Sequence, residues 1–175
     1  MLVMNKNTAV AISEQMLQSY EALHLSTDQV RRVASDEEHK MYCRLVGMIL
    51  GYMLLDLMTP LYDEHPELMP DFMRSSSETA ERGDDSWPAT RAAQAPESEC
   101  SDNTRIGTDL FMLMDKVATD LVQVLDLVSR EHGEGGSDAY RQRVNEILEH
   151  IANAKEYLTA THLGMNACTE KPRRS

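Results

Sequence analysis

The fold is decided by the stretch TDLFMLMDKVATDLVQVLDLVSREHGEGGSDAYRQRVNEILEHIANAKEYL, residues 108–158. Large apolar residues recur in it at alternating steps of four and three, which is the spacing of a seam along one helix face. They are Leu110, Met114, Val117, Leu121, Val124 and Val128, and then Tyr140, Val144, Ile147, Ile151, Ala154 and Leu158. Gly133, Gly135 and Gly136 separate the two series, with Ser137 as the expected N-cap of the second helix. The pattern predicts an antiparallel helical hairpin within residues 104–164.

The N-terminal half, residues 8–73, carries further helical signals. Thr8 is the expected N-cap of a first helix over Ala9–Leu25, and the sequence Ser26–Gln29 has a capping-box pattern that predicts a second start. Ser35–Glu38 repeats this pattern before a helix predicted over Asp36–Met58. That helix is apolar nearly all round, which is typical of a buried helix.

The two halves are separated by a polar stretch. Pro60 is expected either to kink the preceding helix or to open a short one, which Pro66 ends. Residues 74–103 are rich in Ser, Ala, Pro and acids, and bury too little area to offset the chain entropy of folding. We therefore expect a single domain over 1–175: an all-α bundle of four main helices, a long flexible acidic linker over 74–103, and a tail over 165–175.

The charge distribution bears on the class of partner. The net charge is −12, and Leu61–Asp102 holds eleven acidic residues against three arginines. Direct nucleic-acid binding is disfavoured, because the one basic cluster is Lys171, Arg173 and Arg174 in the tail. A protein partner with a basic surface fits this charge better.

Other features favour a cytoplasmic location and no membrane association. The N-terminus lacks the hydrophobic region of a secretion signal, and the apolar run Leu45–Leu55 is too short to span a bilayer. The three cysteines are too far apart to suggest a disulfide framework or a metal site; they are Cys43, Cys100 and Cys168.

Gly47 and Gly51 lie four residues apart on one face of the predicted helix over Asp36–Met58. Each glycine lowers helix stability by about 1 kcal/mol relative to alanine, so a compensating contact is expected. A tight crossing with another helix of the same chain is the first interpretation. The alternatives are a homodimer seam and room for a ligand.

Candidates for metal binding or catalysis are few. Asp36 and His39 are three residues apart, as are Glu146 and Glu149, and His150 follows directly, but a di-metal bundle needs two Glu-x-x-His motifs. Cys43 lies one turn from His39, which would suit a nucleophile and its base, although a helical cysteine is usually a small apolar residue. Asp56 interrupts an apolar turn and is expected at a solvated edge. We expect no cofactor and no metal.

The function favoured by these patterns is non-catalytic protein binding, as in an inhibitor, an immunity or antitoxin-type neutraliser, a chaperone or an adaptor. The alternative is a helical-bundle enzyme or metal-binding protein that uses the His, Glu and Cys side chains above. Apolar anchors and flanking acids are expected to hold the partner, and the two glycines form a helix-packing or dimer face. These partner-binding candidates are Tyr62, Phe72, Met73, Asp84, Asp85 and Trp87.

Overall fold

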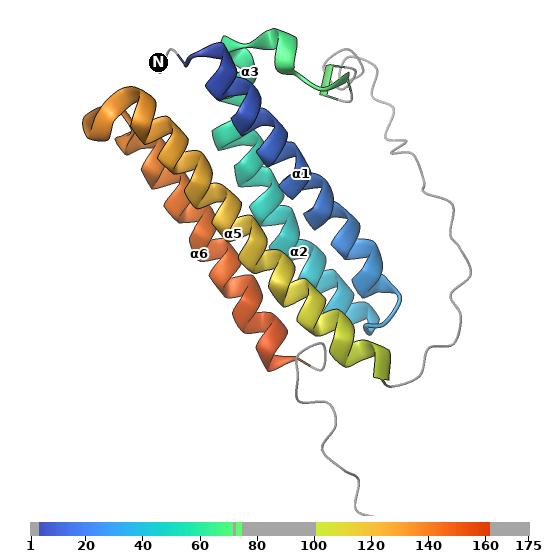
Figure 1. Ribbon diagram of the computed structural model, residues 1–175. Helices are drawn as coiled ribbons and strands as arrows, with labels where there is room; N and C mark the ends of the chain where they lie inside the picture. The colour runs from blue at the N-terminus through green and yellow to red at the C-terminus, as the bar shows by residue number, and fades with distance from the viewer. Residues whose placement is uncertain (1–3, 72, 75–100, 162–175) are drawn as a thin grey trace, which may run out of the picture.

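The structure, a computed structural model, describes residues 4–71, 73–74 and 101–161. Four long helices dominate it (Figure 1): α1 (Lys6–Arg31), α2 (Asp36–Tyr52), α5 (Ser101–Gly136) and α6 (Asp138–Ala160). Three short elements come after α2, namely the π-helix η1 (Met53–Met58), α3 (Thr59–Glu64) and the 3-10 helix η2 (Pro66–Leu68). The predicted all-α bundle of four main helices is confirmed.

The long helices form a ring in which neighbours are antiparallel. Both α1 and α6 contact α2 and α5. Near its end α1 bonds to the first turns of α2 through Ser26 and Tyr42, and near its start it bonds to the last turns of α5 through Asn5 and Glu131. The end of the first helical half, at α3, and the start of α5 lie at opposite ends of the bundle (Figure 1).

The helix starts depend on local capping, with two departures from the sequence analysis. Asn5, rather than Thr8, caps α1, its side chain accepting a 2.9 Å bond from the Asn7 amide. The restart predicted at Ser26 is wrong, because the Ser26 hydroxyl is buried and donates to the Leu23 carbonyl at 2.6 Å instead of capping a new helix. The capping box of Ser35 and Glu38 at the start of α2 is confirmed.

The predicted helix over Asp36–Met58 is α2 continued by the wider turn of η1. A π-helical turn holds one more residue than an α-helical turn, so it rotates the next residues of the chain about the helix axis. Leu57 and Met58 remain buried at its end. Thr59 closes the turn by donating from Oγ1 to the Leu54 carbonyl at 2.9 Å. Pro60 then lies in the first turn of α3, the second of its two expected roles, and α3 ends before Pro66 as predicted.

Helices α5 and α6 form the predicted hairpin. All twelve positions of its apolar seam are buried in one core. Gly133 has φ 70°, a left-handed conformation that side chains disfavour, and this is where the chain breaks. Ser137 precedes α6 as predicted, but its side chain makes no capping bond to the helix.

Three buried serines of α1 bond to three different elements of the bundle. The pairs are Ser13 with Tyr62 of α3 at 3.1 Å, Ser19 with Asp120 of α5 at 2.7 Å, and Ser26 with Tyr42 of α2 at 2.7 Å. Each bond satisfies polar groups that would otherwise be unpaired inside an apolar core.

The expected linker is only partly within the described residues. Helix α5 begins at Ser101, so residues 101–103 are helical rather than part of the linker. The predicted flexibility of 75–100 and the tail at 165–175 lie outside the described residues.

Candidate functional site

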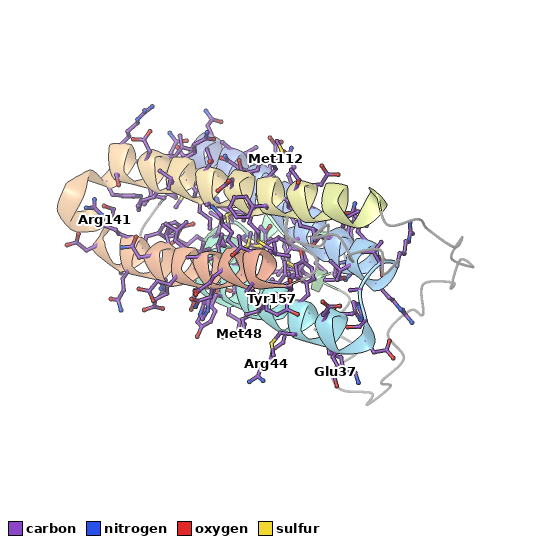
Figure 2. All side chains as sticks on the ribbon, turned by 90° about the horizontal axis from the view of Figure 1, so that it is seen from below. Glu37, Arg44, Met48, Met112, Arg141 and Tyr157 are labelled. Carbon is purple, nitrogen blue, oxygen red and sulfur yellow. The ribbon has the colours of Figure 1, made fainter. Side chains whose placement is uncertain are left out.

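Helix α2 and the adjoining η1 present large apolar side chains on two sides. On the inner side Tyr42, Val46 and Ile49 are fully buried. On the outer side the exposed fractions are 44% for Met41, 40% for Met48, 36% for Tyr52 and 67% for Leu55. Figure 2 shows Met48 and Arg44 pointing away from the other helices. We call the outer set of Met41, Met48, Tyr52 and Leu55, together with Gly47 and Gly51, the α2 outer face.

The α2 outer face is the one place in the described chain where exposed large apolar side chains gather on a single helical stretch. Met41 and Met48 are seven residues apart, which places them along one line of α2, and Leu55 follows in η1. The other exposed large apolar residues of the described chain are Leu25 of α1 and Met112 and Val122 of α5. Met112 lies on the opposite side of the bundle (Figure 2). A contiguous exposed apolar surface is typical of an interaction site, whereas scattered apolar residues are normal.

Helix α6 borders this face. The ring of Tyr52 stacks on that of His150, with centroids 4.8 Å apart and planes 21° from parallel. Near the start of α2, the Tyr157 hydroxyl donates to the Glu38 carbonyl at 3.3 Å. The stack on His150 orients the ring of Tyr52, so a partner would meet a preorganised side chain there.

Within the part of the chain that the structure describes, Gly47 and Gly51 have no internal packing role. A Cβ atom built on either one would meet nothing within 4 Å. The expectation of a tight crossing with another helix of the same chain is therefore wrong: the glycines lie on the side of α2 that faces away from the bundle. Their open space remains available to a second molecule.

The predicted partner-binding residues lie in different environments. Tyr62 is buried, 1% exposed, and bonded to Ser13, so its assignment as an exposed anchor is wrong. The spacing of the apolar residues around Tyr62 in the sequence fits a buried side chain as well as an exposed one. Met73 is half-buried against the core. Phe72, Asp84, Asp85 and Trp87 lie outside the described residues.

His39 and Cys43 do meet, but not as an activated pair. The Cys43 Sγ lies 3.2 Å from the His39 Nε2. Burial raises the pKa of the Cys43 thiol, the negative charge of Asp28 adds to this, and Arg31 only partly opposes it. A nucleophilic cysteine needs a lowered pKa, so this thiol is held in its unreactive protonated form at neutral pH.

The remaining metal and catalytic candidates are dispersed. Glu146 accepts a bond from Gln142 at 3.1 Å, and the ring of His150 stacks on that of Tyr52. Asp56 is half-buried, and its backbone carbonyl accepts a 2.8 Å bond from Arg143. Within the described residues, no three His, Cys, Asp or Glu side chains are placed to hold one metal ion.

Sequence reasoning missed a cleft of about 290 Å³ at the end of the bundle, between α3 and the start of α6. Most of its surface is apolar, with Arg143 and Asp63 among its polar lining residues. The hydroxyl of Tyr140, another lining residue, is buried, and burial raises its pKa so that it stays protonated. No sequence motif indicates this cleft, because its walls come from elements distant in the chain.

The helical stretch from α2 through α3, Asp36–Glu64, is longer than the apolar run considered in the sequence. Its 29 residues include an 18-residue window of mean hydropathy 1.6, enough by length and composition to cross a membrane. Buried helices of soluble proteins have the same properties, and 44% of this window is buried inside the bundle. The stretch is consistent with both kinds of helix.

Comparisons of this chain with known protein families, with curated proteins and with solved structures give no match.

Proposed function

We propose that this chain is a non-catalytic protein-binding protein whose α2 outer face receives a helix of its partner. The observation that carries the proposal is the gathering of Met41, Met48, Tyr52 and Leu55 on the surface of a helix whose other side is already in the core. A helix with a matching apolar stripe would cover these side chains, as amphipathic helices do in hydrophobic grooves.

The chemistry of the face suits this role. Methionine side chains are flexible and polarisable, so they adapt to a partner's shape, while an aromatic residue such as Tyr52 supplies a rigid anchor. The open space at Gly47 and Gly51 would let a partner backbone approach α2 closely. An inhibitor, an immunity or antitoxin-type neutraliser, a chaperone and an adaptor in the cytoplasm all fit such a surface.

We further propose that charge guides a partner with a basic surface toward the chain. The net charge is −12, and Asp84 and Asp85 belong to its most acidic portion. Exposed charges are screened over about 8 Å at physiological salt, so they act on the association rate more than on affinity. Raising the salt concentration should slow association more than it accelerates dissociation. If neither added salt nor charge reversal at Asp84 and Asp85 changes the association rate, the proposed role of charge is refuted.

The binding face is tested by charge insertion with a matched control. The variant Met48→Glu/Leu55→Glu places two carboxylates on the α2 outer face, and Leu25→Glu/Met112→Glu places two on exposed apolar residues elsewhere. Proteins that co-purify from the native host are identified for each chain, and the candidate partner is then purified and titrated. Binding lost with the first variant and kept with the control supports the proposal. Equal binding by all three chains refutes it.

A further inference from the structure

The cleft between α3 and the start of α6 contains a polar side chain that the fold leaves without a hydrogen bond. Tyr140 lines this cleft from the first turn of α6 and is only 6% exposed. Within the described part of the chain, its hydroxyl is buried and has no hydrogen-bond partner. A buried hydroxyl without a partner is unfavourable, and native proteins contain few of them. The Tyr140 hydroxyl is therefore a donor that a molecule in the cleft could use.

A second donor lies near this hydroxyl. Burial raises the pKa of Tyr140, and the positive charge of Arg143 partly opposes the rise, so the guanidinium acts on the phenol. Arg143 also lines the cleft, and its Nη1 donates to the Asp56 carbonyl at 2.8 Å. A guanidinium has several N–H donors, so this bond leaves others available. Because both groups donate, the polar part of a ligand should be an acceptor.

Most of the cleft wall is apolar. Leu57, Leu61 and Met4 are buried lining residues, and Pro60 is half-buried. Small-molecule sites have this character, with apolar walls, a few placed polar groups and volumes of about 300–1,000 Å³. The cleft, at about 290 Å³, lies at the small end of this range. It suits a compact molecule that is largely apolar.

The charged lining residues argue against an ionised ligand. Asp63 is exposed and Glu64 is half-buried, and both line the same cleft as Arg143. The carboxylates of Asp63 and Glu64 would repel a ligand carboxylate, and the guanidinium of Arg143 would repel a ligand ammonium. An uncharged carbonyl oxygen accepts hydrogen bonds and avoids both repulsions.

We propose that this cleft binds a small, uncharged and largely apolar carbonyl compound, whose oxygen accepts a hydrogen bond from the Tyr140 hydroxyl. Leu57 and Leu61 pack against the apolar part of the ligand, and the Arg143 guanidinium supplies a second donor. The cleft shares no lining residue with the α2 outer face, so the inference does not depend on the proposed function.

Two probes of the same shape test the hydrogen bond. Acetophenone has a carbonyl oxygen where α-methylstyrene has a CH2 group. When the full chain is titrated and followed by methyl NMR, both probes should shift the signals of Leu57 and Leu61. The signals of Val122, exposed on α5, should stay unchanged. Acetophenone should bind about two- to tenfold more tightly, which corresponds to one hydrogen bond.

Variants locate the binding site and the donor. Tyr140→Phe removes only the hydroxyl, so the two probes should bind it equally. Its Tm should not fall, because the hydroxyl has no partner within the described chain. Ala139→Trp places an indole at the cleft and should prevent binding of both probes. Ala152→Trp, at another exposed alanine of α6, is the matched control and should bind both probes as the unaltered chain does.

Several results would overturn the inference. Equal binding of the two probes by the unaltered chain would show that the ligand oxygen receives no hydrogen bond. A lower Tm of Tyr140→Phe would show that the hydroxyl is already bonded in the folded chain. Tighter binding of benzoate or benzylamine than of acetophenone would show that the cleft selects a charge. Unchanged signals of Leu57 and Leu61 with every probe would show that the cleft admits no such ligand.

Discussion

Replacing Gly47 and Gly51 with alanine should stabilise the monomer. Both glycines lie within α2, and a Cβ at either would meet nothing within 4 Å, so the substitution adds helix propensity without a clash. Each change should raise the free energy of unfolding by about 1 kcal/mol, and the double variant by about 2 kcal/mol. For a domain of this size that raises Tm by about 4–8 °C.

The assay is denaturant unfolding measured by far-UV circular dichroism, at a protein concentration where the chain is monomeric. The control is Gly133→Ala, the same change at a residue with φ 70°, which should lower stability by about 1–2 kcal/mol because alanine disfavours that conformation. If Gly47→Ala or Gly51→Ala lowers stability instead, the space around α2 is occupied within the chain, and the assignment of an outward face is refuted.

Three further outcomes are expected. Burial raises the pKa of Asp120, but hydrogen bonds from Lys116, Ser19 and Gln15 outweigh it and hold the pKa below its usual value. The contribution of Asp120 to the free energy of unfolding is therefore present above about pH 4, which is the pKa of an aspartate in the unfolded chain. It is lost as the pH falls through the lower pKa that Asp120 has in the folded protein. Asp120→Ala should therefore flatten the acid side of the stability–pH curve and cost about 2 kcal/mol at neutral pH; an unchanged curve would contradict this. Leu121→Asp buries a charge in the core and should abolish cooperative thermal unfolding, whereas an unchanged Tm would disprove its core placement. Cys43 should react with a thiol reagent more slowly than a free cysteine at pH 7, because its pKa is raised; faster labelling would revive a nucleophilic role.

The helical seams and one cap could be predicted because they depend on local spacing. Leu121 and Ile151 belong to series whose period fixes the buried face of α5 and α6. Ser35 and Glu38 satisfy each other's backbone amides within one turn, so the start of α2 needs no information from the rest of the fold.

The wrong predictions concern residues whose sequence context allows two local structures. In each case a contact with a distant part of the chain decides which one forms. Ser26 has the sequence context of a cap, yet its hydroxyl bonds inward to Tyr42, and α1 continues through it. Tyr62 could have anchored a partner, but Ser13 holds its hydroxyl inside the bundle. Neither partner residue is adjacent in sequence, so no periodicity indicates these contacts.

The α2 outer face was partly visible in the sequence. The spacing of Met41, Leu45, Met48, Tyr52 and Leu55 indicates one stripe, although Leu45 packs against the core in the structure. Gly47 and Gly51, four residues apart on one face of the helix, indicate a close approach. The sequence could not say which of two apolar sides of α2 faces the core, since that depends on how α1 and α6 are placed around it.

The three serine bonds of α1 also limit how this bundle can be assembled. Apolar seams tolerate sliding, because a shift of one turn brings one aliphatic side chain where another was. Ser13, Ser19 and Ser26 are distributed along nearly the whole of α1, and each reaches a different element. A displacement of α1 along its axis would break all three bonds at once. The hydroxyls of Ser13, Ser19, Tyr42 and Tyr62 would then lose these partners. The three bonds therefore fix the position of α1 along its axis, whereas hydrophobic packing alone would accept several positions.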